Sequence, residues 1–100
     1  MPRYFNPNSI CPPFNPYSHG AEIKAGSRLV YTAGQVGADK DGNIAPDFEG
    51  QAHLAYANIE IILKDAEMTF ANLVKMTTFL INPDDGPKMR VIRKSFLKDP

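Results

Sequence analysis

The sequence predicts an α+β fold in which a small β-sheet carries two helices on one face, with the elements in the order β-β-α-β-α. Two segments, 28–36 and 73–81, are rich in β-branched and aromatic residues, as strands are. Between and after them, apolar residues recur at helical spacing. The composition, 43% hydrophobic and 22% charged over 100 residues, indicates one small globular domain over residues 1–100.

The N-terminal region is predicted to be an extended arm over residues 1–16, because its prolines fix φ and remove backbone donors. These prolines are Pro2, Pro7, Pro12, Pro13 and Pro16. After the arm we expect a β-hairpin with strands at 18–24 and 28–36, joined through Gly26 and Ser27. The residues Asp41-Gly42-Asn43 then predict a turn.

A first helix is predicted from Asp47 to about Met68, with Asp47 as its N-cap. Its apolar positions recur at steps of three and four residues, and its charged positions are expected to face water. The apolar positions are Phe48, Ala52, Ala55, Ile59, Ile62 and Ala66. The positions expected in water are Glu49, His53, Glu60, Lys64 and Glu67.

The last two elements are a strand at 73–81 and a second helix that ends near Lys98. The strand has little polarity at either parity, so we expect it to be covered on both faces. Asp84 or Asp85 is expected to cap the helix, whose apolar face is marked by Met89, Ile92 and Phe96. Because two helices cover only one face of such a sheet, we expect further copies of the chain to cover the other.

Charge and cysteine content exclude several classes of partner. Eleven basic and eleven acidic residues cancel, so no long-range field gathers nucleic acid or an anionic membrane. Cys11 is the single cysteine, and His19 and His53 lack neighbours at metal-ligand spacing, so we expect no metal site. With no stretch long enough to span a membrane and no apolar leader, we expect a cytoplasmic protein.

The order of motifs is similar to that of the RidA/YjgF family, also called the endoribonuclease L-PSP or translation-inhibitor family. The resemblance covers about 15–100 and is carried by "PYSHG", "LVYTAGQVG", a turn with "DG", "DFEGQAHLAYANIEIILKDA" and "LVKMTTFLIN". It implies a chorismate-mutase-like fold, of which the later strands are absent from this chain. It also implies a homotrimer with clefts between subunits.

The activity that the resemblance implies is the hydrolysis of reactive enamines and imines, such as 2-aminoacrylate, to 2-keto acids and ammonia. It implies no metal or organic cofactor, and a small 2-imino or 2-keto acid as ligand. The substrate carboxylate would be held by a fixed backbone N–H and a cation.

The resemblance also implies candidate site residues. Tyr17 matches a tyrosine that lines the family's cleft, Ala33 and Gly34 match a turn whose backbone approaches the ligand, and Phe79 matches an aromatic residue of the cleft. At Gly34, the missing Cβ would let the backbone reach a small ligand. Asn58 and Lys75 match positions that we interpret as structural.

The catalytic residues are not assigned, because the family's substrate-binding arginine and its acidic residue lie in motifs beyond residue 100. Arg90 and Arg93 match neither motif. The chain is therefore either a piece of a longer protein or a member without this pair. Two alternatives stay open: a non-catalytic ligand-binding or regulatory member, and an RNA-acting translation inhibitor that uses the basic residues of 88–98.

Overall fold

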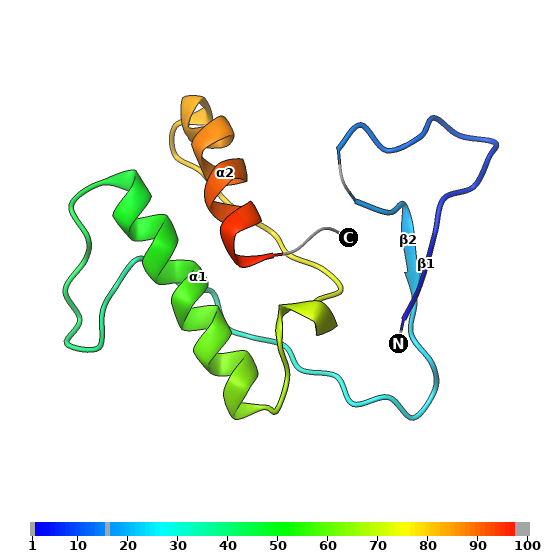
Figure 1. Cartoon of the computed structure of the whole chain (residues 1–100), viewed down its shortest axis with the longest axis horizontal. Coiled ribbons are helices and arrows are strands. Elements are labelled where there is room, and N and C mark those ends of the chain that lie inside the picture. Colours follow the sequence, from blue (N-terminus) through cyan, green and yellow to red (C-terminus); the bar gives the residue numbers. More distant parts are fainter. Residues whose placement is uncertain (1, 16, 98–100) are drawn as a thin grey trace. The chain divides into compact units, whose positions relative to one another are not determined.

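The computed structural model describes residues 2–15 and 17–97, which fall into two units, 2–29 and 30–97. The predicted end of the second helix at Lys98 lies outside the described residues. Figure 1 shows the elements of each unit: strands β1 and β2 in the first, helices α1 and α2 in the second. Each unit is described by itself below.

The first unit contains a short antiparallel ladder. Strand β1, Arg3–Phe5, pairs with strand β2, Gly20–Glu22, so that Phe5 lies opposite Gly20. The Phe5 ring lies over Gly20, where a Cβ would stand 2.5 Å from the ring Cζ, so the ring would have to shift to admit a larger residue. At the other end of the ladder, Arg3 Nε donates to Glu22 Oε1 at 2.9 Å.

The pairing of β2 with the chain's first residues differs from the predicted hairpin of 18–24 with 28–36. A turn does form near Gly26, which has a φ of 84°, and Ser27 N donates to Lys24 O at 3.2 Å. The chain that follows this turn is not a strand in the described structure. The arm, predicted as extended, contributes Arg3–Phe5 as the partner instead.

The connection between β1 and β2 is held by His19. Its backbone N–H donates to Asn6 Oδ1, and its ring Nε2 donates to the Cys11 carbonyl, both at 2.7 Å. The Tyr17 ring meets the His19 ring edge to face, with 5.9 Å between centroids. Histidine thus has a structural role here, as its lack of metal-ligand neighbours indicates.

The second unit begins its regular structure with α1, Phe48–Asp65. Asp47 is the N-cap, as predicted, and its Oδ1 accepts from Gly50 N at 2.7 Å. The helix ends before the predicted Met68 because Glu67 adopts a left-handed φ of 60°, and Met68 N turns back to donate to Leu63 O at 2.8 Å. The four charged residues and His53, which were predicted to face water, are all exposed.

The second helix, α2, spans Gly86–Phe96. A 3-10 helix, Pro83–Asp85, precedes it, and Asn82 caps that helix by accepting from Asp84 N at 3.0 Å. Asp85 stands at the N-cap position of α2 but makes no side-chain cap hydrogen bond. The predicted cap position at Asp85 is confirmed, but its side chain makes no capping hydrogen bond, and the side-chain cap lies one turn earlier at Asn82.

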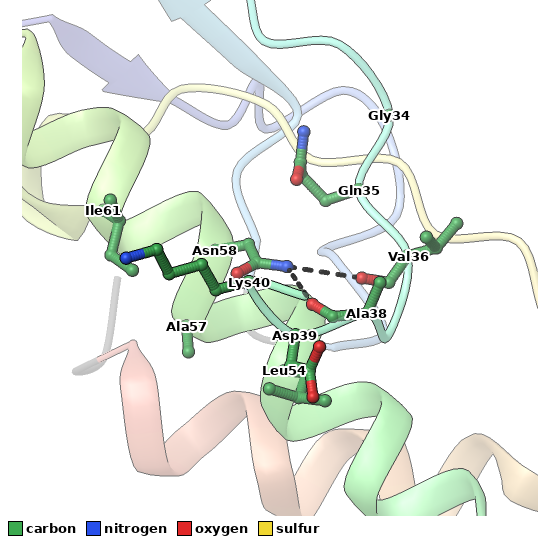
Figure 2. Close-up of a pocket in the computed structure, with 10 residues that line it drawn as sticks. All are labelled: Gly34, Gln35, Val36, Ala38, Asp39, Lys40, Leu54, Ala57, Asn58 and Ile61. Carbon is green, nitrogen blue, oxygen red and sulfur yellow. Dashed lines mark hydrogen bonds between the residues drawn. The ribbon is translucent and has the colours of Figure 1, made fainter. Parts of the chain in front are cut away.

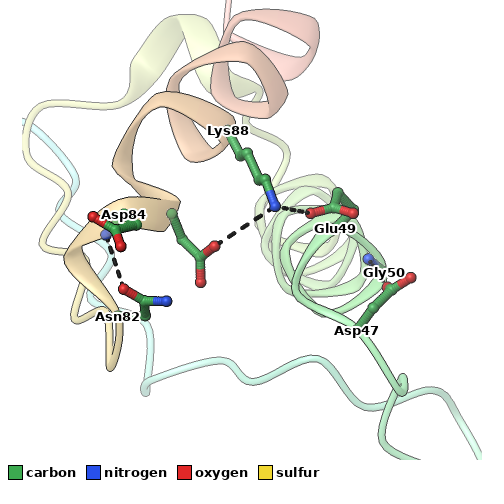
Figure 3. Close-up of polar contacts among 7 residues, drawn as sticks. Asp47, Glu49, Gly50, Asn82, Asp84 and Lys88 are labelled. Atoms are coloured by element: carbon green, nitrogen blue, oxygen red, sulfur yellow. Dashed lines mark hydrogen bonds and ion pairs between the residues drawn. The ribbon is translucent and has the colours of Figure 1, made fainter.

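Lys88 connects the starts of the two helices. Its Nζ lies 3.4 Å from Glu49 Oε1 on α1 and 3.9 Å from Asp85 Oδ1 (Figure 3). The side chains of Lys88 and Glu49 are more than half exposed. Solvent therefore screens these ion pairs, and they stabilise the unit only slightly.

The core of the second unit lies where α1 meets α2, which lie side by side (Figure 1). Ala52, Tyr56 and Ile92 are buried there, and the Tyr56 ring stacks on the Phe96 ring with 5.3 Å between centroids. A rim of partly buried residues packs around them: Phe48, Phe70, Met76, Met89, Phe96 and Leu97. The apolar faces of the two helices thus meet each other; their packing on one face of a sheet stays a prediction.

The segments 28–36 and 73–81, predicted as strands, form no β-ladder among the described residues, whose sheet has two strands, β1 and β2. Their aromatic side chains are largely in solvent, with Tyr31 91% and Phe79 92% exposed. A strand needs a hydrogen-bonding neighbour as well as suitable residues. The two-helix, two-strand arrangement remains compatible with an α+β fold, and the full order β-β-α-β-α stays a prediction.

Candidate functional site

A pocket of about 570 Å³ lies between helix α1 and the segment 34–40 (Figure 2). This volume is within the range of pockets that hold small molecules. Its lining residues are Gly34, Gln35, Val36, Ala38, Asp39, Lys40, Leu54, Ala57, Asn58 and Ile61. The pocket is open to solvent on one side, and Ile61 is 64% exposed at its edge.

The wall that α1 contributes follows directly from helical spacing. Its residues are Leu54, Ala57, Asn58 and Ile61. Steps of three and four residues place side chains on one face of a helix. The buried residues Ala52, Tyr56 and Leu63 follow a different stripe of α1. The helix therefore presents one face to the core and another to the pocket.

The opposite wall is held against α1 at Gly37. This glycine is buried, and a Cβ on it would lie 2.7 Å from the Gln51 carbonyl oxygen and 2.5 Å from Gln51 Cβ. Only glycine permits this approach of the chain to the helix backbone. Gln51 also secures the far side of the loop, because its Nε2 donates to Ala45 O at 2.9 Å.

The Asn58 side chain joins the two walls. Its Nδ2 donates to Ala38 O at 3.0 Å and to Val36 O at 3.5 Å (Figure 2). These carbonyls are the neighbours of Gly37 on either side, so the amide spans the point of closest approach. The direction of the segment 34–38 is thereby fixed relative to α1.

The turn after Ala38 places Asp39 and Lys40 at the pocket. Asp39 Oδ1 accepts from Asp41 N and from Asn43 N, each at 2.9 Å, and Gly42 takes a φ of 85° to close the turn. The backbone hydrogen bond from Asn43 is the main cause that lowers the pKa of Asp39 below its ordinary value, with partial desolvation opposing it. Asp39 is therefore a carboxylate committed to the turn.

The pocket combines an aliphatic wall with a few polar groups. Val36, Leu54 and Ala57 supply apolar surface, whereas the Lys40 ammonium supplies a positive charge. The backbone N–H groups of Gly34 and Gln35 form no hydrogen bond among the described residues. Such a set can hold a small molecule that carries one carboxylate and a short alkyl chain.

The residues predicted from the sequence are not all brought together. Gly34 lines the pocket, and Ala33 adjoins it through its carbonyl, which accepts from Gln35 Nε2 at 3.3 Å. Phe79 does not line this pocket. Tyr17 belongs to the other unit, beside His19. Ligand contacts of all four residues stay predictions.

Gly37 was not identified from the sequence as the glycine that permits the close approach of the loop to α1. A Cβ on Gly37 would clash with Gln51, whereas a Cβ on Gly34 would meet nothing within 4 Å. Asn58 was interpreted only as structural, although asparagine in a helix interior disfavours the helix and so indicates that its side chain has a partner. Lys40 was not singled out. Its position in a turn beside Asp41-Gly42 gives no signal of a pocket.

Other kinds of site find no support in the part of the chain that the structure describes. No cluster of three or more His, Cys, Asp or Glu side chains there could hold a metal ion. Cys11 is exposed and free. Within the same residues, no helix has the length and apolar character needed to cross a membrane.

The chain belongs to the endoribonuclease L-PSP family, the RidA/YjgF family, whose family model matches residues 8–100. It is 35% identical over 69 residues to the RutC family protein YjgH of Escherichia coli, which covers 69% of this chain and 52% of that protein. It is 29% identical to the putative reactive intermediate deaminase TdcF of Escherichia coli over 84% of this chain and 64% of TdcF.

A further relative is the 2-iminobutanoate/2-iminopropanoate deaminase of the mite Dermatophagoides farinae. It is 24% identical over 88% of this chain and 68% of its own length. The chain thus spans between about half and two thirds of the length of these curated relatives.

Proposed function

We propose that the protein hydrolyses reactive 2-imino acids, or the enamines in equilibrium with them, to 2-keto acids and ammonia. Two relatives bear the names of deaminases that act on such intermediates. The observation that carries the proposal to this chain is the pocket at Gly34, which is lined by aliphatic surface, by Lys40 and by two backbone N–H groups that form no hydrogen bond within residues 2–15 and 17–97.

In the proposed complex, the substrate carboxylate lies against Lys40 and the backbone N–H groups of Gly34 and Gln35. The alkyl chain lies on Leu54 and Ala57. Water adds to the carbon of the C=N bond, and the resulting carbinolamine expels its nitrogen as ammonia while the C=O bond forms. Fixing the carboxylate holds the reacting carbon in one orientation toward water, which lowers the entropic part of the barrier.

The test uses 2-iminobutanoate generated in solution from 2-aminobutanoate by an amino-acid oxidase. We expect the protein to release 2-oxobutanoate and ammonia faster than the spontaneous hydrolysis does. The variant Lys40→Ala is expected to raise KM about tenfold or more, the effect of one charge-assisted hydrogen bond. Lys75→Ala removes an exposed lysine away from the pocket and is the matched control. No acceleration by the unsubstituted protein rejects the proposal.

A second candidate is a member that binds 2-keto acids without catalysis. It is favoured by the state of Asp39, the carboxylate that lines the pocket. Its lowered pKa and its hydrogen bonds to the turn make it a weak base for moving a proton. Calorimetric titration with 2-oxobutanoate distinguishes the two: binding without any acceleration of hydrolysis identifies this second function.

Assembly and location are part of the proposal. Tyr31, Phe79 and Ile81 are exposed apolar side chains, and we propose a homotrimer in which neighbouring subunits cover them. Burying them would remove unfavourable contact with water. A cytoplasmic location stays a prediction. The mass in solution, from light scattering, tests the trimer, and a monomeric mass at micromolar concentration rejects it.

A further inference from the structure

The Asn58 side chain is the sole primary amide of α1 that reaches the pocket, among the residues that line it. It bridges to carbonyls 20 and 22 residues earlier in the chain, at Ala38 and Val36. Hydrogen bonds between residues so far apart in the sequence hold the loop against the helix, whereas bonds between sequence neighbours do not. The bond to Ala38 is partly buried, so its loss would leave polar groups without full access to water.

The residue type suits this arrangement. A primary amide nitrogen carries two N–H donors, and here Nδ2 lies within hydrogen-bond distance of two carbonyl oxygens. Aspartate at the same position would present oxygen to oxygen, and alanine would leave both carbonyls without this partner. The short asparagine side chain therefore matches both the number and the direction of the acceptors.

Residues 36–45, the loop that Asn58 contacts, depend on the same hydrogen bonds. Ala38 N donates to Val36 O at 2.8 Å across Gly37, and Ala45 N donates to Gly37 O at 2.9 Å. Two backbone hydrogen bonds of the loop thus involve the three residues that Asn58 holds, 36–38. Gly34 and Gln35, which line the pocket, directly precede this segment, so a displacement of 36–38 from α1 would displace them as well.

We propose that Asn58 is a positioning residue: its amide clamps residues 36–38 on α1 and thereby orients the backbone groups of Gly34 and Gln35 for the ligand. This inference deepens the proposed function and rests on it for the identity of the ligand. Asn58 is not a catalytic residue, because it acts through the segment that it holds.

The experiment compares Asn58→Ala and Asn58→Gln with Glu60→Ala, a control on an exposed position of the same helix. Hydrogen–deuterium exchange is followed in peptides that cover 36–45. Asn58→Ala is expected to speed exchange of the Ala38 and Ala45 amides about tenfold, as expected for the loss of one to two hydrogen bonds. Asn58→Gln, which keeps both donors, restores part of the protection. Glu60→Ala leaves it unchanged.

The ligand arm uses 2-oxobutanoate, followed through the backbone amide signals of Gly34 and Gln35. Asn58→Ala is expected to weaken binding about tenfold, with Asn58→Gln in between. Equal exchange in Asn58→Ala and Glu60→Ala overturns the clamp, and equal affinity overturns its positioning role. Failure of the unsubstituted protein to bind 2-oxobutanoate counts against the proposed function, whereas the exchange result still decides the clamp.

A measurement on the unsubstituted protein covers the case in which Asn58→Ala does not fold. The side-chain amide protons of Asn58 are expected to show nuclear Overhauser contacts to Gly37 and Ala38, and slow exchange with solvent. Absence of those contacts overturns the inference directly.

Discussion

Replacement of Gly37 by alanine tests the geometry of the pocket most sharply. A Cβ there would stand 2.5 Å from Gln51 Cβ, whereas ordinary contact begins at 3.4 Å. The loop would have to withdraw by the difference, about 1 Å, because the atoms on the other side include the backbone of α1. The Asn58 bond to Val36 O, already 3.5 Å long, would break first.

The expected cost combines two effects. Overpacking of a well-filled site costs about 1–3 kcal/mol, and loss of one side-chain hydrogen bond adds about 1 kcal/mol. We therefore expect Gly37→Ala to lower the free energy of unfolding by about 2–4 kcal/mol, which corresponds to a fall in Tm of about 10 °C or more.

The control is Gly34→Ala, three residues earlier. A Cβ at Gly34 meets nothing within 4 Å, and its φ is not left-handed. Its free energy of unfolding is expected to stay within about 0.5 kcal/mol of the unsubstituted value. Urea denaturation followed by far-UV circular dichroism measures both variants. Equal stability of the two would refute the close approach of this loop to α1.

Four further predictions concern the helix cap, the core and the turn. Asp47→Ala removes the acceptor of the Gly50 N–H and is expected to cost about 1 kcal/mol of stability in urea denaturation; an unchanged midpoint contradicts this role. The Tyr56 hydroxyl is buried and has no hydrogen-bond partner in the described part of the chain, so Tyr56→Phe is expected to be neutral or to stabilise by up to about 1 kcal/mol; a loss above about 1 kcal/mol would contradict the absence of a partner. Burial raises the pKa of Tyr56, and the positive charge of Arg93 opposes this shift. Ionisation of Tyr56 therefore favours the unfolded state, so the free energy of unfolding is unaffected below pH 10 and falls as pH rises further. Alkaline denaturation of the unsubstituted protein, compared with that of Tyr56→Phe, measures this loss. The pKa of Asp39 in the folded protein is lowered from 3.8, so its contribution to the free energy of unfolding is present above pH 3.8 and is lost as pH falls through the folded pKa. Carbon-13 NMR titration of the carboxyl group should show a midpoint below 3.8. A midpoint at the ordinary value would contradict the hydrogen bonds of the turn.

The helices were predictable because their signals are local. The apolar spacing and Asp47 are sufficient to place the start of α1, and Met89, Ile92 and Phe96 mark the face of α2 that the core uses. The end of α1 was not predictable, because it depends on Glu67, a residue type that rarely adopts a left-handed φ. Endpoints set by one unusual backbone angle carry no pattern in the sequence.

The strands were predicted less well because strand formation depends on a partner. Residues 28–36 have the composition of a strand, yet β2 pairs with Arg3–Phe5 from the proline-rich arm. Composition reports whether a segment can be extended, whereas the ladder depends on contacts distant in sequence. The same limit applies to the site: Gly34 was found by its motif, but the role of Gly37 requires knowledge of where Gln51 lies.

Helix α1 serves two purposes with two faces, since Tyr56 packs in the core while Asn58, two residues later, lines the pocket. Substitutions selected for ligand binding and substitutions selected for thermal stability therefore fall in the same eighteen-residue helix. A library screened only for tighter ligand binding is expected to enrich substitutions at the contact with α2 as well, away from the pocket. Substitutions that stabilise α1 also stabilise the pocket wall that this helix forms.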